Sequence, residues 1–237
     1  MRERLWVALD VETLEEADGL LERLAGAAIG AKIGAQLFTA AGPAAVETAL
    51  KRGFPVFLDL KYHDIPTTVA GAVREATRAG VRLLDVHAAG GVAMMRAAAE
   101  AATTAAKDFG VPRPVCLGVT VLTSLDRKGL DEVGVSGNVE AHVLCLAERA
   151  REGGLEGCVA SPQEIALLRR ALGRTWVIVT PGIRTNGSRN DQRRIATPAA
   201  AIRAGADAIV VGRPITAAPD PQAAAAAILE EITAALR

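Results

Sequence analysis

A cluster of charged residues follows an apolar run in the segment FLDLKYHDIPTTV, residues 57–69. Asp59 and Lys61 are two residues apart, so in a β-strand their side chains would lie on the same face. In a dry site the ammonium would keep the neighbouring carboxylate ionised. Asp64, where such a strand would turn into a helix, could bring a second acid. Alternating charges of this kind can fix one lysine as a proton donor.

Two further charged residues end neighbouring predicted strands. Asp10 follows residues 5–9, and Lys32 lies near the end of residues 28–33, where it could supply a second cation. The alternative interpretation is an ion-pair cluster with a purely structural role, since such networks also shift pKa values, or simple surface charge.

A second group of residues has the types needed to bind phosphate. The segment TPGIRTNGSRNDQRRIATP, residues 180–198, is rich in Gly, Asn and Arg, and GADAIVVGRPI follows at 205–215. Gly212 would let backbone N–H groups approach an anion, and Arg213 could bind it with two hydrogen bonds. The first segment is long enough to act as a lid. The alternative is an ordinary surface loop with incidental arginines.

Other residues with reactive side chains give weaker signals. His63 and His87 could be acid–base groups, but scattered histidines are more often packed or surface residues. Asp10, Asp59, Asp64 and Asp85 could collect Mg²⁺, although the Lys61 ammonium would compete for the same carboxylates. The wide spacing of Cys116, Cys145 and Cys158 predicts buried free thiols in a reducing compartment.

The composition excludes several classes of protein. The 237 residues include 27 Lys and Arg and 27 Asp and Glu, so no overall field favours nucleic acid or an anionic membrane. The sequence contains neither a signal peptide nor an apolar run of about 20 residues that could span a membrane. We therefore expect a cytoplasmic protein with no nucleic-acid or membrane partner.

Short β-rich runs alternate with helical patterns along the whole chain. Thr13 with Glu16, and Ser161 with Glu164, have capping-box spacing, while Thr197–Pro198 and Asp220–Pro221 have the pattern of helix starts. The predicted strands are residues 5–9, 28–33, 56–60, 83–87, 115–120, 157–160, 176–180 and 208–212. Eight strand–helix units in a chain of this length favour a single (β/α)₈ TIM barrel with parallel strands over residues 1–237. A doubly wound open sheet is the alternative.

The chain resembles the orotidine 5′-phosphate decarboxylase family, of the shorter bacterial type. The segment DLKYHDIPTTV fits the family signature D-x-K-x-x-D-I-P-x-T-V. Further matching segments, in the right order, are VALD, GAKIG, VHAAGG, VTVLTS, TPGIR and VVGRPIT.

This resemblance implies a homodimer whose active sites lie at the subunit interface, with Asp64, Ile65 and Thr68 contributed across it. It implies that Asp10, with help from Lys32, and Thr68 contact the ribose, that Thr123 contacts the pyrimidine, and that the phosphate is bound by the arginine-containing segments. The implied catalytic residues are Lys61, Asp59, Asp64 and Lys32, and the implied substrate-binding residues are Asp10, Lys32, Ile65, Thr68, Thr123, Arg184, Gln192, Gly212 and Arg213.

The implied reaction converts orotidine 5′-monophosphate into uridine 5′-monophosphate and CO₂, the last step of pyrimidine nucleotide synthesis, with Lys61 protonating C6 and no metal or organic cofactor. Two alternatives stay open. One is a Mg²⁺-dependent phosphosugar decarboxylase or aldolase-type synthase, which would share the D-x-K-x-x-D core. The other is a nucleotide-binding regulatory barrel without catalysis.

Overall fold

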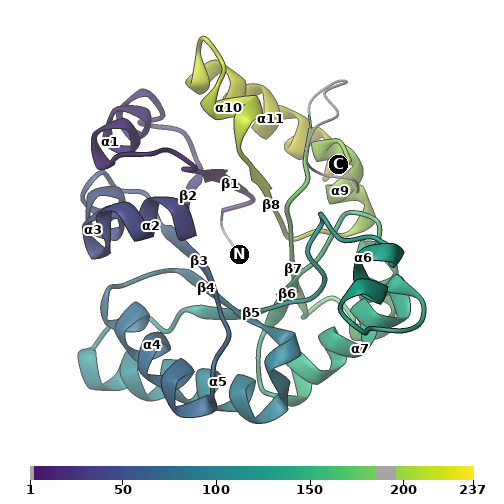
Figure 1. The fold of residues 1–237 in the computed structure, drawn as a ribbon. Coiled ribbons are helices and arrows are strands. Elements are labelled where there is room, and N and C mark those ends of the chain that lie inside the picture. Colours follow the sequence, from purple (N-terminus) through teal and green to yellow (C-terminus); the bar gives the residue numbers. More distant parts are fainter. Residues whose placement is uncertain (1–2, 185–195) are drawn as a thin grey trace.

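Eight parallel strands close into a barrel in the computed structural model, which describes residues 3–184 and 196–237 (Figure 1). Each strand pairs with the next along the chain, and β8 pairs with β1 to close the sheet. The predicted barrel is thereby confirmed, and an open sheet is excluded. The strands are β1 (Leu5–Ala8), β2 (Gly30–Gly34), β3 (Val56–Tyr62), β4 (Leu83–His87), β5 (Val115–Val119), β6 (Gly157–Val159), β7 (Val177–Thr180) and β8 (Ala208–Val211).

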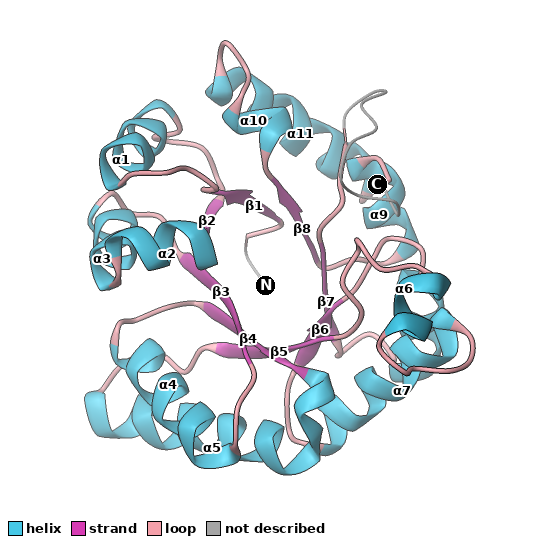
Figure 2. Cartoon of the chain, in the orientation of Figure 1, coloured by secondary structure: helices cyan, strands magenta, loops and turns pink. Residues whose placement is uncertain are grey.

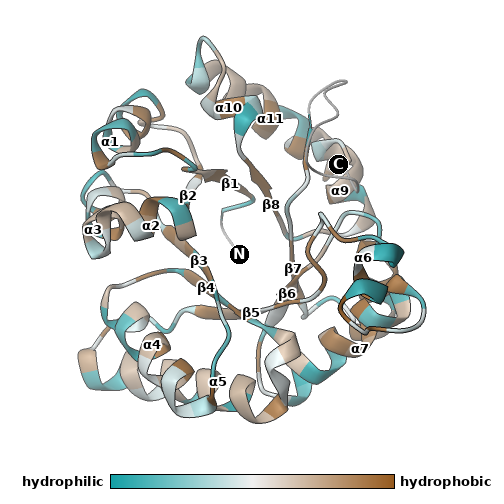
Figure 3. Cartoon of the chain, in the orientation of Figure 1, coloured by the Kyte–Doolittle hydropathy of each residue, from teal (hydrophilic) through white to brown (hydrophobic). Residues whose placement is uncertain are grey.

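Helices surround the barrel as an outer ring (Figure 2). The strands are largely hydrophobic (Figure 3), because side chains on both of their faces are covered. The helices are α1 (Leu14–Arg23), α2 (Ala35–Ala41), α3 (Pro43–Lys51), α4 (Pro66–Arg78), α5 (Gly91–Phe109), α6 (Arg127–Glu132), α7 (Val139–Glu152), α8 (Ile165–Leu172), α9 (Pro198–Ala204), α10 (Arg213–Thr216) and α11 (Pro221–Ala235), with a 3₁₀ turn, η1 (Ala88–Gly90).

Three of the four predicted helix starts are confirmed. Thr13 and Glu16 form the capping box of α1, and the side chains of Thr197 and Asp220 cap α9 and α11. The prediction for Ser161 was wrong. Its hydroxyl accepts from the Gln163 N–H in a turn, and α8 begins only after that turn.

The barrel interior below the rim is filled by large apolar side chains. Trp6 and Phe57 meet edge to face, with ring centroids 6.0 Å apart. A Cβ atom at Gly30, beside Trp6 on the next strand, would lie 2.3 Å from the indole ring. Glycine at this position therefore makes room for the Trp6 side chain inside the barrel.

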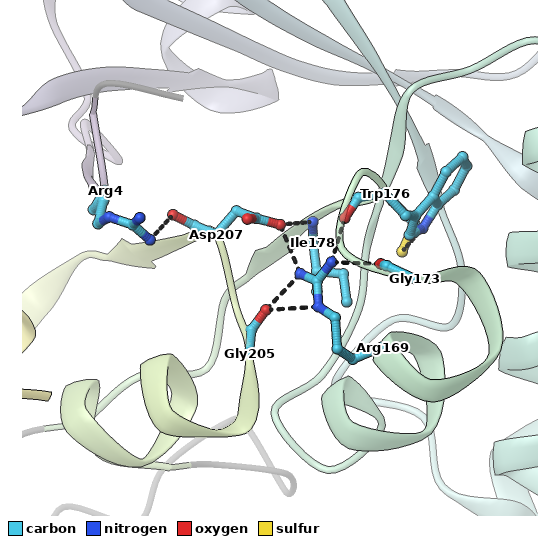
Figure 4. Close-up of polar contacts among 8 residues, drawn as sticks. Arg4, Arg169, Gly173, Trp176, Ile178, Gly205 and Asp207 are labelled. Carbon is cyan, nitrogen blue, oxygen red and sulfur yellow. Dashed lines mark hydrogen bonds and ion pairs between the residues drawn. The ribbon is translucent and has the colours of Figure 1, made fainter. Parts of the chain in front are cut away.

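A hydrogen-bonded cluster around Arg169 of α8 ties the last strands together (Figure 4). The guanidinium donates to the carbonyls of Gly205, Gly173 and Trp176 and pairs with the Asp207 carboxylate at 2.7 Å. This carboxylate also accepts the N–H of Ile178 in β7, and the Asp207 carbonyl accepts from Arg4, which precedes β1. The cluster thus joins β7, β8 and β1 where the barrel closes.

Two sequence expectations about the rest of the molecule were tested. Among the described residues, no helix is both long enough and apolar enough to span a membrane.

All three cysteines are free thiols, but only Cys116 and Cys158 are buried. Cys145 is exposed, because it lies off the face of α7 that packs on the barrel through Val143 and Leu146.

Candidate active site

The carboxyl end of β3 departs from regular strand geometry where Asp59 and Lys61 lie. Leu58 pairs with Leu84 of β4, but the next paired residue, Tyr62, is opposite Val86. Residues 59–61 therefore lie opposite the single residue Asp85, which makes a bulge. Lys61 has φ +50°, and among the described non-glycine residues it alone has a positive φ.

Four alternating charges extend across the ends of β1, β2 and β3. Lys32 Nζ lies 3.4 Å from Asp10 Oδ1 and 3.0 Å from Asp59 Oδ2. The other Asp59 oxygen, Oδ1, pairs with Lys61 Nζ. A hydrogen bond from Leu9 N–H to the Lys32 carbonyl holds the chain before Asp10 against β2. The predicted cluster is therefore formed within one chain by Asp10, Lys32, Asp59 and Lys61.

The inner members of this row are well shielded from solvent. The Lys32 side chain is 9% exposed and that of Asp59 13%. A Cβ at Gly34 would approach Lys32 Nζ to 3.1 Å, so the glycine leaves space for the lysine head group. This shielding lets the charges act on each other with little screening by water.

The electrostatic environment favours the ionised forms of Lys32 and Asp59. Burial by itself would lower the pKa of Lys32, but the charges of Asp59 and Asp10 outweigh burial and raise it. Burial likewise opposes ionisation of Asp59, yet the Lys32 charge, the Asp85 side chain and the Lys61 charge together lower its pKa to about 2. The site therefore holds a carboxylate between two ammonium groups.

The cavity above this row has a volume of about 520 Å³ and is lined by several predicted binding residues. Thr123 lies on the loop after β5, and Arg184 follows β7. Gly212 is the N-cap residue of α10, and Arg213 is the first residue of that helix. Arg184 and Arg213, the predicted phosphate-binding arginines, thus line the same cavity as the row of alternating charges (the charge row) described above.

Other predicted site residues lie elsewhere. Asp64, Ile65 and Thr68 are exposed and are not among the described residues that line this cavity. Ile65, at 64% exposure, presents a large apolar side chain to solvent, and its N–H donates to Asp64 Oδ1. The expectation from the residues alone that Asp64 serves its own barrel thus finds no support in the cavity lining. Gln192 lies outside the described residues.

The two candidate histidines lie next to each other, with ring centroids 5.4 Å apart. Burial, together with His63 and Lys61, lowers the pKa of His87. Neither histidine is among the described residues lining the cavity. Within the described residues, no three His, Cys, Asp or Glu side chains gather as a metal site would require.

Asp85 is part of the site, although from the sequence we considered it only as one of four carboxylates that could collect Mg²⁺. It is fully buried in β4 and accepts the Lys61 backbone N–H at Oδ1, over 2.8 Å. Burial and the neighbouring Asp59 carboxylate raise its pKa well above the usual range. The available signal was a lone acid inside the apolar strand sequence LLDVH, on the face that points into the barrel.

Comparisons with known proteins show the family to which the chain belongs. Residues 3–228 match the family described as orotidine 5′-phosphate decarboxylase / HUMPS. A Moorella thermoacetica protein named orotidine 5′-phosphate decarboxylase is 55% identical over 233 residues, covering 98% of this chain and 92% of the relative. One of the same name from Syntrophotalea carbinolica is 52% identical over 239 residues, covering 99% and 97%.

A solved structure has the same fold over nearly its whole length. The crystal structure of orotidine 5′-phosphate decarboxylase from Lactobacillus acidophilus superimposes with a TM-score of 0.86 at 36% identity, covering 97% of this chain and 99% of that one. The chain belongs to the orotidine 5′-phosphate decarboxylase / HUMPS family.

Proposed function

We propose that this chain is a carboxy-lyase that converts orotidine 5′-monophosphate into uridine 5′-monophosphate and CO₂, with Lys61 as the proton donor to C6. Family membership and the names of the relatives support the reaction. The observation that carries the role of Lys61 is its pairing with Asp59 at the wall of the cavity.

The lining of the cavity suggests how the nucleotide binds. Its phosphate fits the side formed by Arg184, Gly212 and Arg213, because guanidinium groups bind phosphate with two parallel hydrogen bonds. The pyrimidine then extends toward Thr123 and Lys61. Asp10 and Lys32, which line the same cavity, would then bind the ribose hydroxyls.

The chemical step needs a group that both stabilises and protonates an anion. When the bond from C6 to the carboxylate breaks, CO₂ leaves and the electron pair stays on C6. The Lys61 ammonium provides a fixed positive charge beside that pair. An N–H bond of Lys61 then breaks, and its proton forms the new C6–H bond.

Asp59 and Lys32 prepare Lys61 for this step. Asp59 fixes the ammonium through Oδ1, while Lys32 holds the other carboxylate oxygen. Because both Asp59 oxygens are held before substrate arrives, little reorganisation accompanies the reaction. An Asp59 carboxylate near the leaving carboxylate of the substrate would also disfavour the bound ground state.

We further propose that a second copy of the chain completes the site. Asp64, Ile65 and Thr68 belong to the family signature but lie exposed outside their own cavity. A partner chain that packs over this segment would receive the Asp64 carboxylate next to its Lys61. The Thr68 hydroxyl would reach the ribose, and the exposed Ile65 side chain would be covered.

The deciding experiment follows the ultraviolet absorbance of orotidine 5′-monophosphate mixed with the protein in excess chelator. We expect rapid loss of substrate absorbance with the wild type and none above background with Lys61→Ala. A matched control is Lys51→Ala, which removes an exposed lysine from α3 and should leave turnover unchanged.

Other outcomes would redirect the assignment. Near-normal turnover by a folded Lys61→Ala protein would refute the proton-donor role. Binding of uridine 5′-monophosphate without any turnover by the wild type would indicate a regulatory barrel. Neither binding nor turnover, followed by activity on phosphosugars once Mg²⁺ is restored, would indicate the phosphosugar branch of the family.

A further inference from the structure

The bulge in β3 gives Asp85 of β4 an unusual position. In a regular ladder, Asp85 would lie opposite Asp59, and backbone groups would pair across the two strands. Here residues 59–61 all lie opposite Asp85, so the local ladder is interrupted. The backbone N–H groups of the bulge need other partners, because an unpaired buried N–H is costly.

The Asp85 side chain supplies such a partner for the residue that carries the proton. The Lys61 N–H donates to Asp85 Oδ1 over 2.8 Å. Lys61 has φ +50°, a conformation that L-residues adopt only when the surroundings hold them there. The hydrogen bond therefore acts on the strained peptide unit from which the catalytic ammonium extends.

The other carboxyl oxygen of Asp85 has an environment that suits a hydroxyl. No described residue donates a hydrogen bond to the buried Oδ2. The charged groups that interact with Asp85 come from β3, and they are the Asp59 carboxylate and the Lys61 ammonium, with the Tyr62 phenol also near. Burial and Asp59 raise the pKa of Asp85, which makes the neutral acid the stable form.

We propose that Asp85 is a positioning residue for the proton donor. As a neutral acid it accepts the Lys61 N–H at Oδ1 and offers its hydroxyl to the Asp59 carboxylate. It thereby holds in place both the backbone of Lys61 and the Asp59 carboxylate that pairs with the Lys61 ammonium. This inference rests on the function proposed for Lys61.

Two substitutions at Asp85 separate positioning from charge. Asp85→Asn keeps a carbonyl oxygen that can accept the Lys61 N–H and an amide group that can donate to the Asp59 carboxylate, so kcat should stay within about threefold of the wild type. Asp85→Ala removes both, and kcat should fall at least about tenfold because small misplacements of catalytic groups are costly. The KM should change little in either variant, since Asp85 is not among the described residues lining the cavity.

A control variant on the same strand reports the effect of lost packing alone. Val86 is buried and belongs to the apolar layer between barrel and helices. Val86→Ala should lower the melting temperature and leave kcat unchanged. Hydrogen exchange of the Lys61 amide adds a readout on the wild-type protein, where we expect slow exchange.

Several results would overturn the inference. A loss of kcat in Asp85→Asn as large as in Asp85→Ala would show that the carboxylate charge is needed. A wild-type kcat in Asp85→Ala would show that no positioning occurs. If Asp85→Ala does not fold, a tenfold loss in folded Asp85→Asn, or fast exchange of the wild-type Lys61 amide, refutes the proposal. Failure of the wild type to decarboxylate the nucleotide would instead refute the proposed function, and the exchange experiment would still test the contact.

Discussion

Replacing Lys61 with glycine and with alanine isolates the backbone strain at the proposed proton donor. Both substitutions remove the ammonium, so both lose the ion pair with Asp59. They differ in how well the new residue tolerates φ +50°. We expect the glycine variant to be the more stable of the two, although alanine is the better residue at most positions.

The expected difference follows from two opposing effects. A left-handed conformation costs an L-residue roughly 1–2 kcal/mol, which glycine avoids. Glycine gains freedom in the unfolded chain, which costs it roughly 0.4–1 kcal/mol of stability. The midpoints of the two ranges give a net advantage of Lys61→Gly over Lys61→Ala of about 0.8 kcal/mol, or about 2–3 °C in melting temperature for a chain of this size.

The assay is urea denaturation and differential scanning calorimetry of both variants in one buffer. Lys107, an exposed residue near the end of α5, provides the control pair Lys107→Gly and Lys107→Ala. Glycine should be the less stable of that pair, because the helix requires an ordinary negative φ. An alanine variant at position 61 that equals or exceeds the glycine variant would refute the reasoning.

Three further predictions concern the charges of the site. Asp59→Asn should lower the free energy of unfolding by roughly 2 kcal/mol at neutral pH. The reason is that the pKa of Asp59 is about 2 in the folded protein against the usual 3.8, so the ionised carboxylate contributes stability above pH 4 that is lost as the pH falls toward 2. A stability difference between wild type and variant that does not depend on pH, measured by urea titration, would contradict this. Arg213→Ala should weaken binding of uridine 5′-monophosphate by roughly 1.5–3 kcal/mol in calorimetry, and unchanged affinity would exclude Arg213 from the phosphate site. Mixing inactive Asp64→Ala chains with inactive Lys61→Ala chains should restore part of the activity through one intact interface site, and no recovery in proven heterodimers would place Asp64 in its own subunit.

The sequence was a good guide wherever local patterns decide the structure. The run LLDVH predicted β4 without error, because its buried residues cover both faces of a parallel strand. Asp59 and Lys61 both line the cavity, as their two-residue spacing suggested, but the backbone there is a bulge and not the regular strand that the argument assumed.

Features that depend on neighbouring strands were beyond local patterns. The bulge at residues 59–61 exists only relative to β4, so the left-handed backbone of Lys61 could not be read from β3 alone. The role of Asp85 follows from that bulge. Ser161 has the spacing of a cap, but a turn shifts the start of α8 past it. The exposure of Cys145 was in principle readable from helical periodicity.

The distribution of charge around the cavity also bears on how a nucleotide arrives. Asp10, Lys32, Asp59 and Lys61 together carry no net charge, whereas Arg184 and Arg213 line another part of the wall. The whole chain is neutral as well, so a distant phosphate meets no directing field. Within a screening length of about 8–10 Å, however, the two arginines attract it while the charge row does not. If the two arginines bind the phosphate as proposed, the nucleotide would turn phosphate-first toward them during its final approach, before any hydrogen bond forms.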